Sequence, residues 1–165
     1  MAVQQAAVSR QAARSADRVE IGGRLVALAG AAVFLYGLGF LITNFTIFLE
    51  VGLGPQQVGG TASGIQGYSP QLYGYVSHLQ AALAGFIMGS GLMVVGLGWF
   101  GIRRRQAWAM WNGLIGMSVA LAAAIPLHYV YGLATPVHVG PVYLATAVFL
   151  AGTALAWSGL RAKAA

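Results

Sequence analysis

The spacing of charged residues limits what this chain can fold into more than any other feature. No charged side chain lies between Arg24 and Glu50, between Glu50 and Arg103, or between Arg105 and Arg161. A helix rises about 1.5 Å per residue, so about 20 apolar residues cross the roughly 30 Å hydrocarbon core of a bilayer. Only 7% of the residues are charged, against about 25% in a soluble domain. The chain is therefore expected to be an integral membrane protein.

Turn signals divide the uncharged stretches into four spans. Ser69 and Pro70 can cap and begin a helix, Pro126 is expected to kink or end one, and Pro141 is expected to begin the last. Residues 51–69 hold six glycines and are expected to form an irregular loop. We therefore predict an all-α, polytopic membrane domain over residues 25–165, a four-transmembrane-helix bundle with spans at about 25–49, 70–102, 107–131 and 141–160.

The first 24 residues are polar and basic and precede the first span. The apolar run at 25–49 is too long for a cleaved secretory signal, whose core has roughly 7–15 residues, so it is expected to be retained. Arg10, Arg14 and Arg18 are spaced by four residues and would form one stripe on a helix. Residues 1–24 are therefore expected to be a cytoplasmic tail, either frayed or forming an amphipathic helix on anionic lipid.

Basic residues before the first span, between the second and third, and after the fourth all fall on one side of the membrane. Under the positive-inside rule, both termini and all nine Lys and Arg residues are predicted to be cytoplasmic, Lys163 included. The net charge of +6 then reflects topology and lipid rather than nucleic acid. The Ala-, Gly- and Arg-rich composition suggests a bacterial protein, hence the inner membrane. The topology and lipid residues are Arg10, Arg14, Arg18, Arg24, Arg103, Arg104 and Arg105, and the interfacial anchors are Trp99, Trp108, Trp111 and Trp157.

Small residues one helical turn apart mark candidate helix contacts. Gly85 with Gly89, and Gly152 with Ala156, follow the small-xxx-small pattern that allows close backbone approach. We expect contacts within the bundle, with contact to another subunit or coincidence among 24 glycines as alternatives. Asn44, inside the first span, is expected to hydrogen-bond to a neighbouring helix.

Every histidine, and the single acidic residue outside the N-terminal tail, gathers toward the outer side. His78 and His128 each lie about 20 residues beyond the tryptophans of their spans, which places both about 30 Å from the inner interface. Glu50 ends the first span at a similar level, and His138 lies in the outer loop between the last two spans.

These residue types suit a cofactor site. Imidazoles and carboxylates bind metal ions, so Glu50, His78, His128 and His138 are candidate metal ligands. His78 and His128, on different helices, could instead hold a haem or another pigment, or contact a quinone headgroup. The alternative is that these side chains only anchor the helix ends at a wet interface. The cofactor is thus left open among metal, haem or pigment, and quinone.

No catalytic signature appears in the chain, and no cysteine is present for thiol chemistry. A transporter or proton-coupled exporter is disfavoured because no charged residue lies at mid-membrane. We therefore expect an accessory or structural subunit that packs within a larger membrane complex, or associates with itself, and whose enzymatic role would be only that of such a complex. A cofactor-binding membrane protein is the alternative, and a small channel or transporter is a second one.

Overall fold

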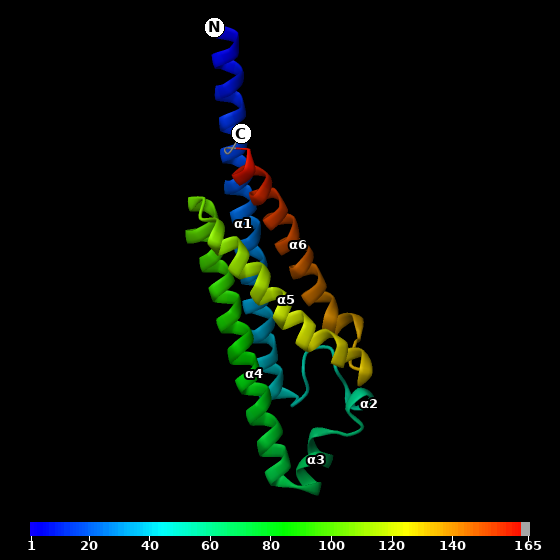
Figure 1. Cartoon of the computed structure of the whole chain (residues 1–165). Helices are drawn as coiled ribbons and strands as arrows, with labels where there is room; N and C mark the ends of the chain where they lie inside the picture. Colours follow the sequence, from blue (N-terminus) through cyan, green and yellow to red (C-terminus); the bar gives the residue numbers. More distant parts are fainter. Residues whose placement is uncertain (163–165) are drawn as a thin grey trace.

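The computed structural model of the chain describes residues 1–162, apart from the side chains of residues 7 and 8, so Lys163 lies outside the described residues. Within this range the regular structure is helical (Figure 1). The elements are α1 Ala2–Thr46, α2 Pro55–Val58, α3 Ala62–Tyr68, α4 Pro70–Gly96, the π-helix η1 Leu97–Gly101, the 3₁₀-helix η2 Ile102–Arg104, α5 Ala107–Val130 and α6 Pro136–Arg161.

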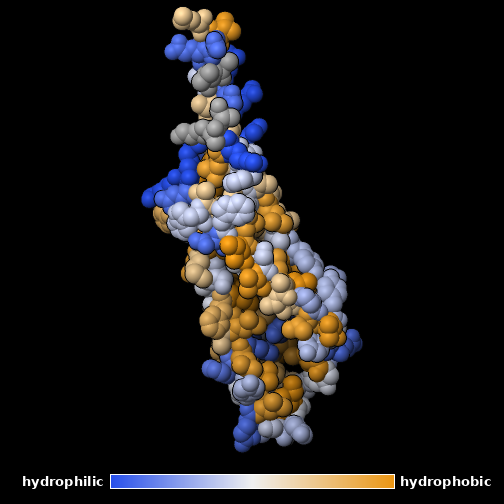
Figure 2. All heavy atoms as spheres, viewed as in Figure 1, coloured by the Kyte–Doolittle hydropathy of each residue, from blue (hydrophilic) through white to orange (hydrophobic). Residues whose placement is uncertain are grey.

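Four helices are long and apolar enough to cross a membrane. The first is α1, and the second is the continuous helical run formed by α4, η1 and η2. The third and fourth are α5 and α6. Apolar side chains cover most of the visible surface of their bundle, whereas hydrophilic side chains gather on the projecting N-terminal part of α1 (Figure 2). The structure thus confirms the prediction of an all-helical chain with four helices of membrane-spanning length and composition.

Helix α1 is the central element and packs along both α4 and α6 (Figure 1). Glycines make this close packing possible. A Cβ atom added at Gly22 would lie 2.5 Å from the Gly152 carbonyl oxygen, and one added at Gly91 would lie 2.5 Å from the Phe34 amide nitrogen. The main buried cluster includes Val26 of α1 and Phe149 of α6. Helix α5, by contrast, packs chiefly against η1 and is mostly exposed along its length.

One end of the bundle collects the basic residues, because the N-terminal half of α1, the α4–α5 turn and the end of α6 all lie there (Figure 1). Glu20 of α1 joins two of them: its carboxylate lies 2.9 Å from Arg24 and 2.7 Å from Arg103. Arg103 also lies 3.9 Å above the ring of Trp99. We call this the basic end, and the opposite end the histidine end.

The helix boundaries differ from expectation at the first span. No break occurs at residue 24: α1 continues back to Ala2, and its first part projects beyond the bundle (Figure 1). The sequence of this part is rich in Ala, Gln and Arg, which have high helix propensity. Helix α1 also ends earlier than predicted, at Thr46 rather than at residue 49.

The last two spans differ as well. Pro126 lies inside α5, which runs on to Val130, because a single proline removes one backbone bond without ending the helix. Helix α6 starts at Pro136 rather than at Pro141, since Thr135 caps its first turn and a proline is favourable there. The expected outer loop is therefore only five residues long, and His138 lies in a helix.

The second span and the connection before it also carry unexpected turns. Ser69 caps α4 as predicted, accepting a hydrogen bond from the Leu72 amide at 3.1 Å. The other end of this second span departs from α-helical geometry in η1 and η2. Arg105 then closes the turn with a φ of 62°. Residues 51–69, expected to be irregular, contain the short helices α2 and α3.

Candidate functional site

The histidine end holds a polar group built around His138, in the first turn of α6. The Thr135 hydroxyl accepts a hydrogen bond from the His138 amide at 3.2 Å and donates one to the Gly52 carbonyl at 2.8 Å. Gly52 has a φ of +79°, and a Cβ atom there would lie 2.6 Å from the His138 amide nitrogen, so only glycine fits. This contact holds the connection after α1 against α6.

The side chain of His138 is 1% exposed, and its ring stacks on Phe40 with centroids 5.7 Å apart. Its Nδ1 atom lies 2.7 Å from the Val51 carbonyl oxygen. A carbonyl can only accept, so Nδ1 carries the proton and donates it. The Nε2 atom of a neutral His138 is therefore an acceptor with a lone pair.

His128 of α5 has the same arrangement and faces His138. Its Nδ1 atom lies 2.8 Å from the Ala124 carbonyl oxygen, so Nδ1 is again the donor. The two Nε2 atoms are 3.0 Å apart. With both rings neutral, two lone pairs would face each other at hydrogen-bond distance. The geometry is favourable only when one additional proton lies between the rings, which makes the pair an imidazole–imidazolium hydrogen bond.

A carboxylate and a hydroxyl complete the group. The Glu50 Oε2 atom lies 3.6 Å from His138 Nε2 and can balance the charge of the shared proton. Burial raises the pKa of the Glu50 carboxyl, and the neighbouring His128 acts in the opposite direction. The Tyr36 hydroxyl of α1 donates to the His138 carbonyl at 2.5 Å. We call Tyr36, Glu50, His128 and His138 the histidine-end cluster.

The structure thus joins three of the four residues proposed from sequence as metal ligands. His78 is exposed on α4 and makes no hydrogen bond to the other three within residues 1–162. The close partner of His128 is His138, rather than His78 as in the expected haem or pigment pair. Within the described part of the chain, no group of three or more His, Asp or Glu side chains has an arrangement that could hold a metal ion.

Two polar residues within α1 complete this picture. Sequence reasoning overlooked Tyr36, although a tyrosine hydroxyl inside an apolar span signals a buried hydrogen-bond partner. Asn44 was expected to bond to another helix, and this is confirmed: its amide donates to the Ser77 hydroxyl of α4 at 3.1 Å.

The small-residue pairs differ in their surroundings. Gly152 and Ala156 pack directly against α1, and Ala156 is fully buried. Gly85 and Gly89 are exposed on α4, and a Cβ atom added at either meets no described atom within 4 Å. The first pair therefore serves the bundle itself, and the second faces away from it.

The tryptophans lie toward the basic end. Trp111 and Trp157 meet edge to face with centroids 5.6 Å apart, and the Trp108 indole donates to the Gln106 side chain at 2.9 Å. With Trp99 beneath Arg103, each proposed anchor contacts a polar or aromatic neighbour at that end.

Comparison with protein-family models, with curated proteins and with solved structures finds no match to this chain. Its function must therefore be argued from the residues themselves.

Proposed function

We propose that the chain is a multi-pass protein of a bacterial inner membrane, with the basic end and both termini in the cytoplasm. The support is the collection of the basic residues at one end of four apolar helices. The histidine-end cluster then lies at the outer face of the membrane.

We propose further that this is a proton-responsive membrane protein, in which the histidine-end cluster takes up and releases the proton between His128 and His138. The single observation that carries this proposal is the 3.0 Å Nε2–Nε2 contact between two rings whose Nδ1 atoms both face carbonyl oxygens. With one proton between them, one Nε2 atom donates a hydrogen bond to the other. With no proton two lone pairs face each other, and with two protons two N–H groups do.

The shared proton would control the attachment of α5. This helix has few buried residues along its length and packs mainly at its η1 end. At its other end, the pair joins His128 of α5 to His138 of α6, and through Val51 to the connection after α1. Loss of the hydrogen bond would therefore loosen the outer half of α5 and leave the α1–α4–α6 contacts in place.

Nitrogen-15 NMR of histidine-labelled protein in lipid nanodiscs tests this proposal. Across a pH series we expect a range in which one Nε2 proton signal is coupled to both rings. Thermal stability should follow a bell-shaped curve against pH, because zero and two protons both break the bond. The His128→Gln variant should lose the shared signal and flatten the curve.

His78→Gln is the matched control, since it removes an exposed histidine outside the cluster. The proposal is wrong if His78→Gln and His128→Gln change the curve equally, or if the Nε2 signals of His128 and His138 in wild-type protein show no coupling to each other at any pH. A stoichiometric metal that is present in wild type and absent from His128→Gln would mean that a metal ion, and no proton, joins the two Nε2 atoms.

A second candidate function is that of an accessory subunit in a membrane complex. The observation that favours it is the open surface at Gly85 and Gly89, where no described part of the chain fills the space that a close helix contact would need. Native mass spectrometry of the tagged protein, extracted mildly from its own membranes, tests it. Loss of co-purifying chains from Gly85→Ile, but not from Ser118→Ile at an exposed position on α5, would support this role. A mass equal to a multiple of the bare chain would refute it.

A further inference from the structure

A cleft of about 780 Å³ lies between α4–η1 and α5, toward the basic end. Its base reaches Val33 of α1, and Met93 lines its α4 wall. On the α5 wall, Gly113 and Gly116 leave room between the larger side chains of Trp108 and Met117. The volume falls within the range of about 300–1,000 Å³ that is typical of small-molecule sites.

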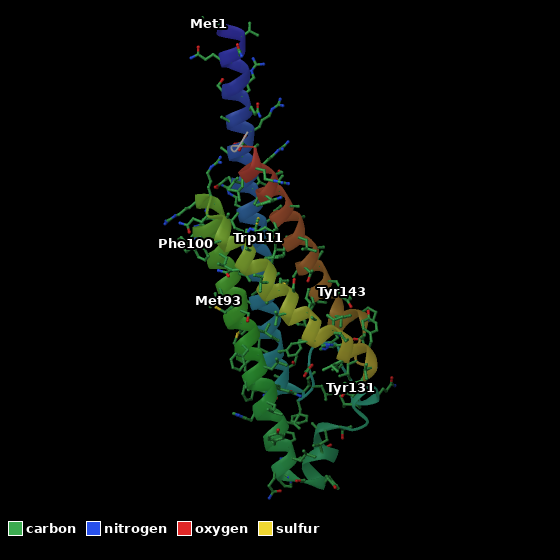
Figure 3. The ribbon with its side chains drawn as sticks, in the orientation of Figure 1. Met1, Met93, Phe100, Trp111, Tyr131 and Tyr143 are labelled. Atoms are coloured by element: carbon green, nitrogen blue, oxygen red, sulfur yellow. The ribbon has the colours of Figure 1, made fainter. Side chains whose placement is uncertain are left out.

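The cleft exists because α4 and α5 are held together at only one end. At the turn, a Cβ atom on Gly101 would overlap the Cβ of Ala109, so the two segments touch there. Beyond the turn, α5 packs against η1 but makes little contact with α4. Met93 and Phe100, which both line the cleft, follow one another along this side of the molecule (Figure 3).

A cation lies at the mouth of the cleft. Arg104 lines it, and its guanidinium lies 5.7 Å from the centre of the Phe100 ring. The neighbouring Arg103 is neutralised by Glu20, whereas Arg104 has no acidic partner among the described residues. An unneutralised arginine at the opening of an apolar cleft is complementary to an anion attached to an apolar tail.

The polarity of the lining falls with depth. Gln106 and Trp108 lie beside Arg104 at the mouth, and Asn112 lies six residues farther along the chain than Gln106, about 9 Å deeper at helical rise. The α4 wall carries one further hydroxyl, that of Ser90 at the deep end of the cleft, and the rest of the α4 and α5 lining is mainly apolar or glycine. A cation and amide groups at the mouth, followed by a mainly apolar channel, match the phosphate, ester and acyl parts of a phospholipid.

We propose that this cleft binds one phospholipid with an anionic headgroup, its phosphate at Arg104 and an acyl chain between α4 and α5. The site is independent of the histidine-end cluster and lies toward the other end of the bundle. A neutral amphiphile such as an isoprenoid quinone would not need the unpaired arginine, so anionic lipid is the occupant that the charge favours.

Native mass spectrometry tests the site on protein taken from vesicles of equal parts phosphatidylglycerol and phosphatidylcholine. Wild type should retain one phosphatidylglycerol in preference to phosphatidylcholine. The Arg104→Gln variant should lower that preference about tenfold, the cost of losing one charge-assisted hydrogen bond. Arg105→Gln, the same charge change in the same turn but outside the lining, should change it less than about twofold.

Two further variants test the cleft itself. Gly116→Leu fills open space in the lining and should abolish retention of both lipids, whereas Ser118→Leu on the same helix, outside the lining, should not. Equal effects of Arg104→Gln and Arg105→Gln would overturn the proposal in favour of non-specific surface attraction. So would a bound neutral isoprenoid quinone that survives in Arg104→Gln and is lost from Gly116→Leu.

Discussion

Replacing Gly22 by alanine tests whether close backbone contact between α1 and α6 holds the bundle together. The added Cβ atom would lie 2.5 Å from the Gly152 carbonyl oxygen and 2.6 Å from the Ala156 amide nitrogen. Both are backbone atoms, so no side chain can rotate away, and the helices must separate by about 0.9 Å to restore ordinary contact at 3.4 Å. Overpacking of this kind costs about 1–3 kcal/mol, which exceeds the gain of up to about 1 kcal/mol from replacing a helical glycine by alanine.

Gly89→Ala is the matched control, because a Cβ atom there meets no described atom within 4 Å. This variant should be more stable than wild type by about 0.5–1 kcal/mol, the helix-propensity gain alone. The assay is reversible unfolding in mixed micelles, followed by tryptophan fluorescence and circular dichroism. The two substitutions should shift the free energy of unfolding in opposite directions. A stabilising Gly22→Ala would refute the close α1–α6 packing, and a destabilising Gly89→Ala would show that this face is already covered.

Three further predictions concern the histidine-end cluster. Tyr36→Phe leaves the buried His138 carbonyl without its donor and should lower the free energy of unfolding by about 1 kcal/mol, measured in the same assay. Gly52→Ala combines a positive φ with backbone overlap and should cost at least about 1 kcal/mol; it should also remove the shared-proton NMR signal. Because burial raises the folded-state pKa of Glu50 above its ordinary value of 4.5, protonated Glu50 stabilises the fold below that value, and this contribution is lost as pH rises through the folded-state pKa. In Glu50→Gln, that part of the pH dependence should be absent.

The four long apolar helices were predictable because a sequence displays directly the length and the low charge that a helix needs to cross a bilayer. Caps at Ser69 and prolines near helix starts also carry local signals. Residues 1–24 were left open between an amphipathic helix and a frayed tail, because their composition suits both, and their unbroken continuation into the first span was not predicted. Nothing in the sequence marked the π-helical turn at Leu97–Gly101, where bundle packing decides the backbone geometry.

The depth of the site along the helices was predictable from the sequence, but the pairing of its histidine side chains was not. Depth follows from counting residues along a helix, so the gathering of Glu50, His128 and His138 was foreseeable. The choice of His138 over His78 as the partner of His128 depends on the rotation of each helix about its axis. It also depends on the positive φ of Gly52, which places Val51 against His138. Neither property has a local sequence signal.

The position of α1 between α4 and α6 has a consequence for biosynthesis. Gly22 and Val26 find their partners on α6, which leaves the ribosome more than 120 residues after they do. In the proposed membrane topology, this face of α1 would therefore be turned toward lipid or toward an insertion factor while the intervening helices are made. The bundle therefore closes only once α6 has been made, so a product truncated before α6 would present an unfilled glycine face to quality-control proteases.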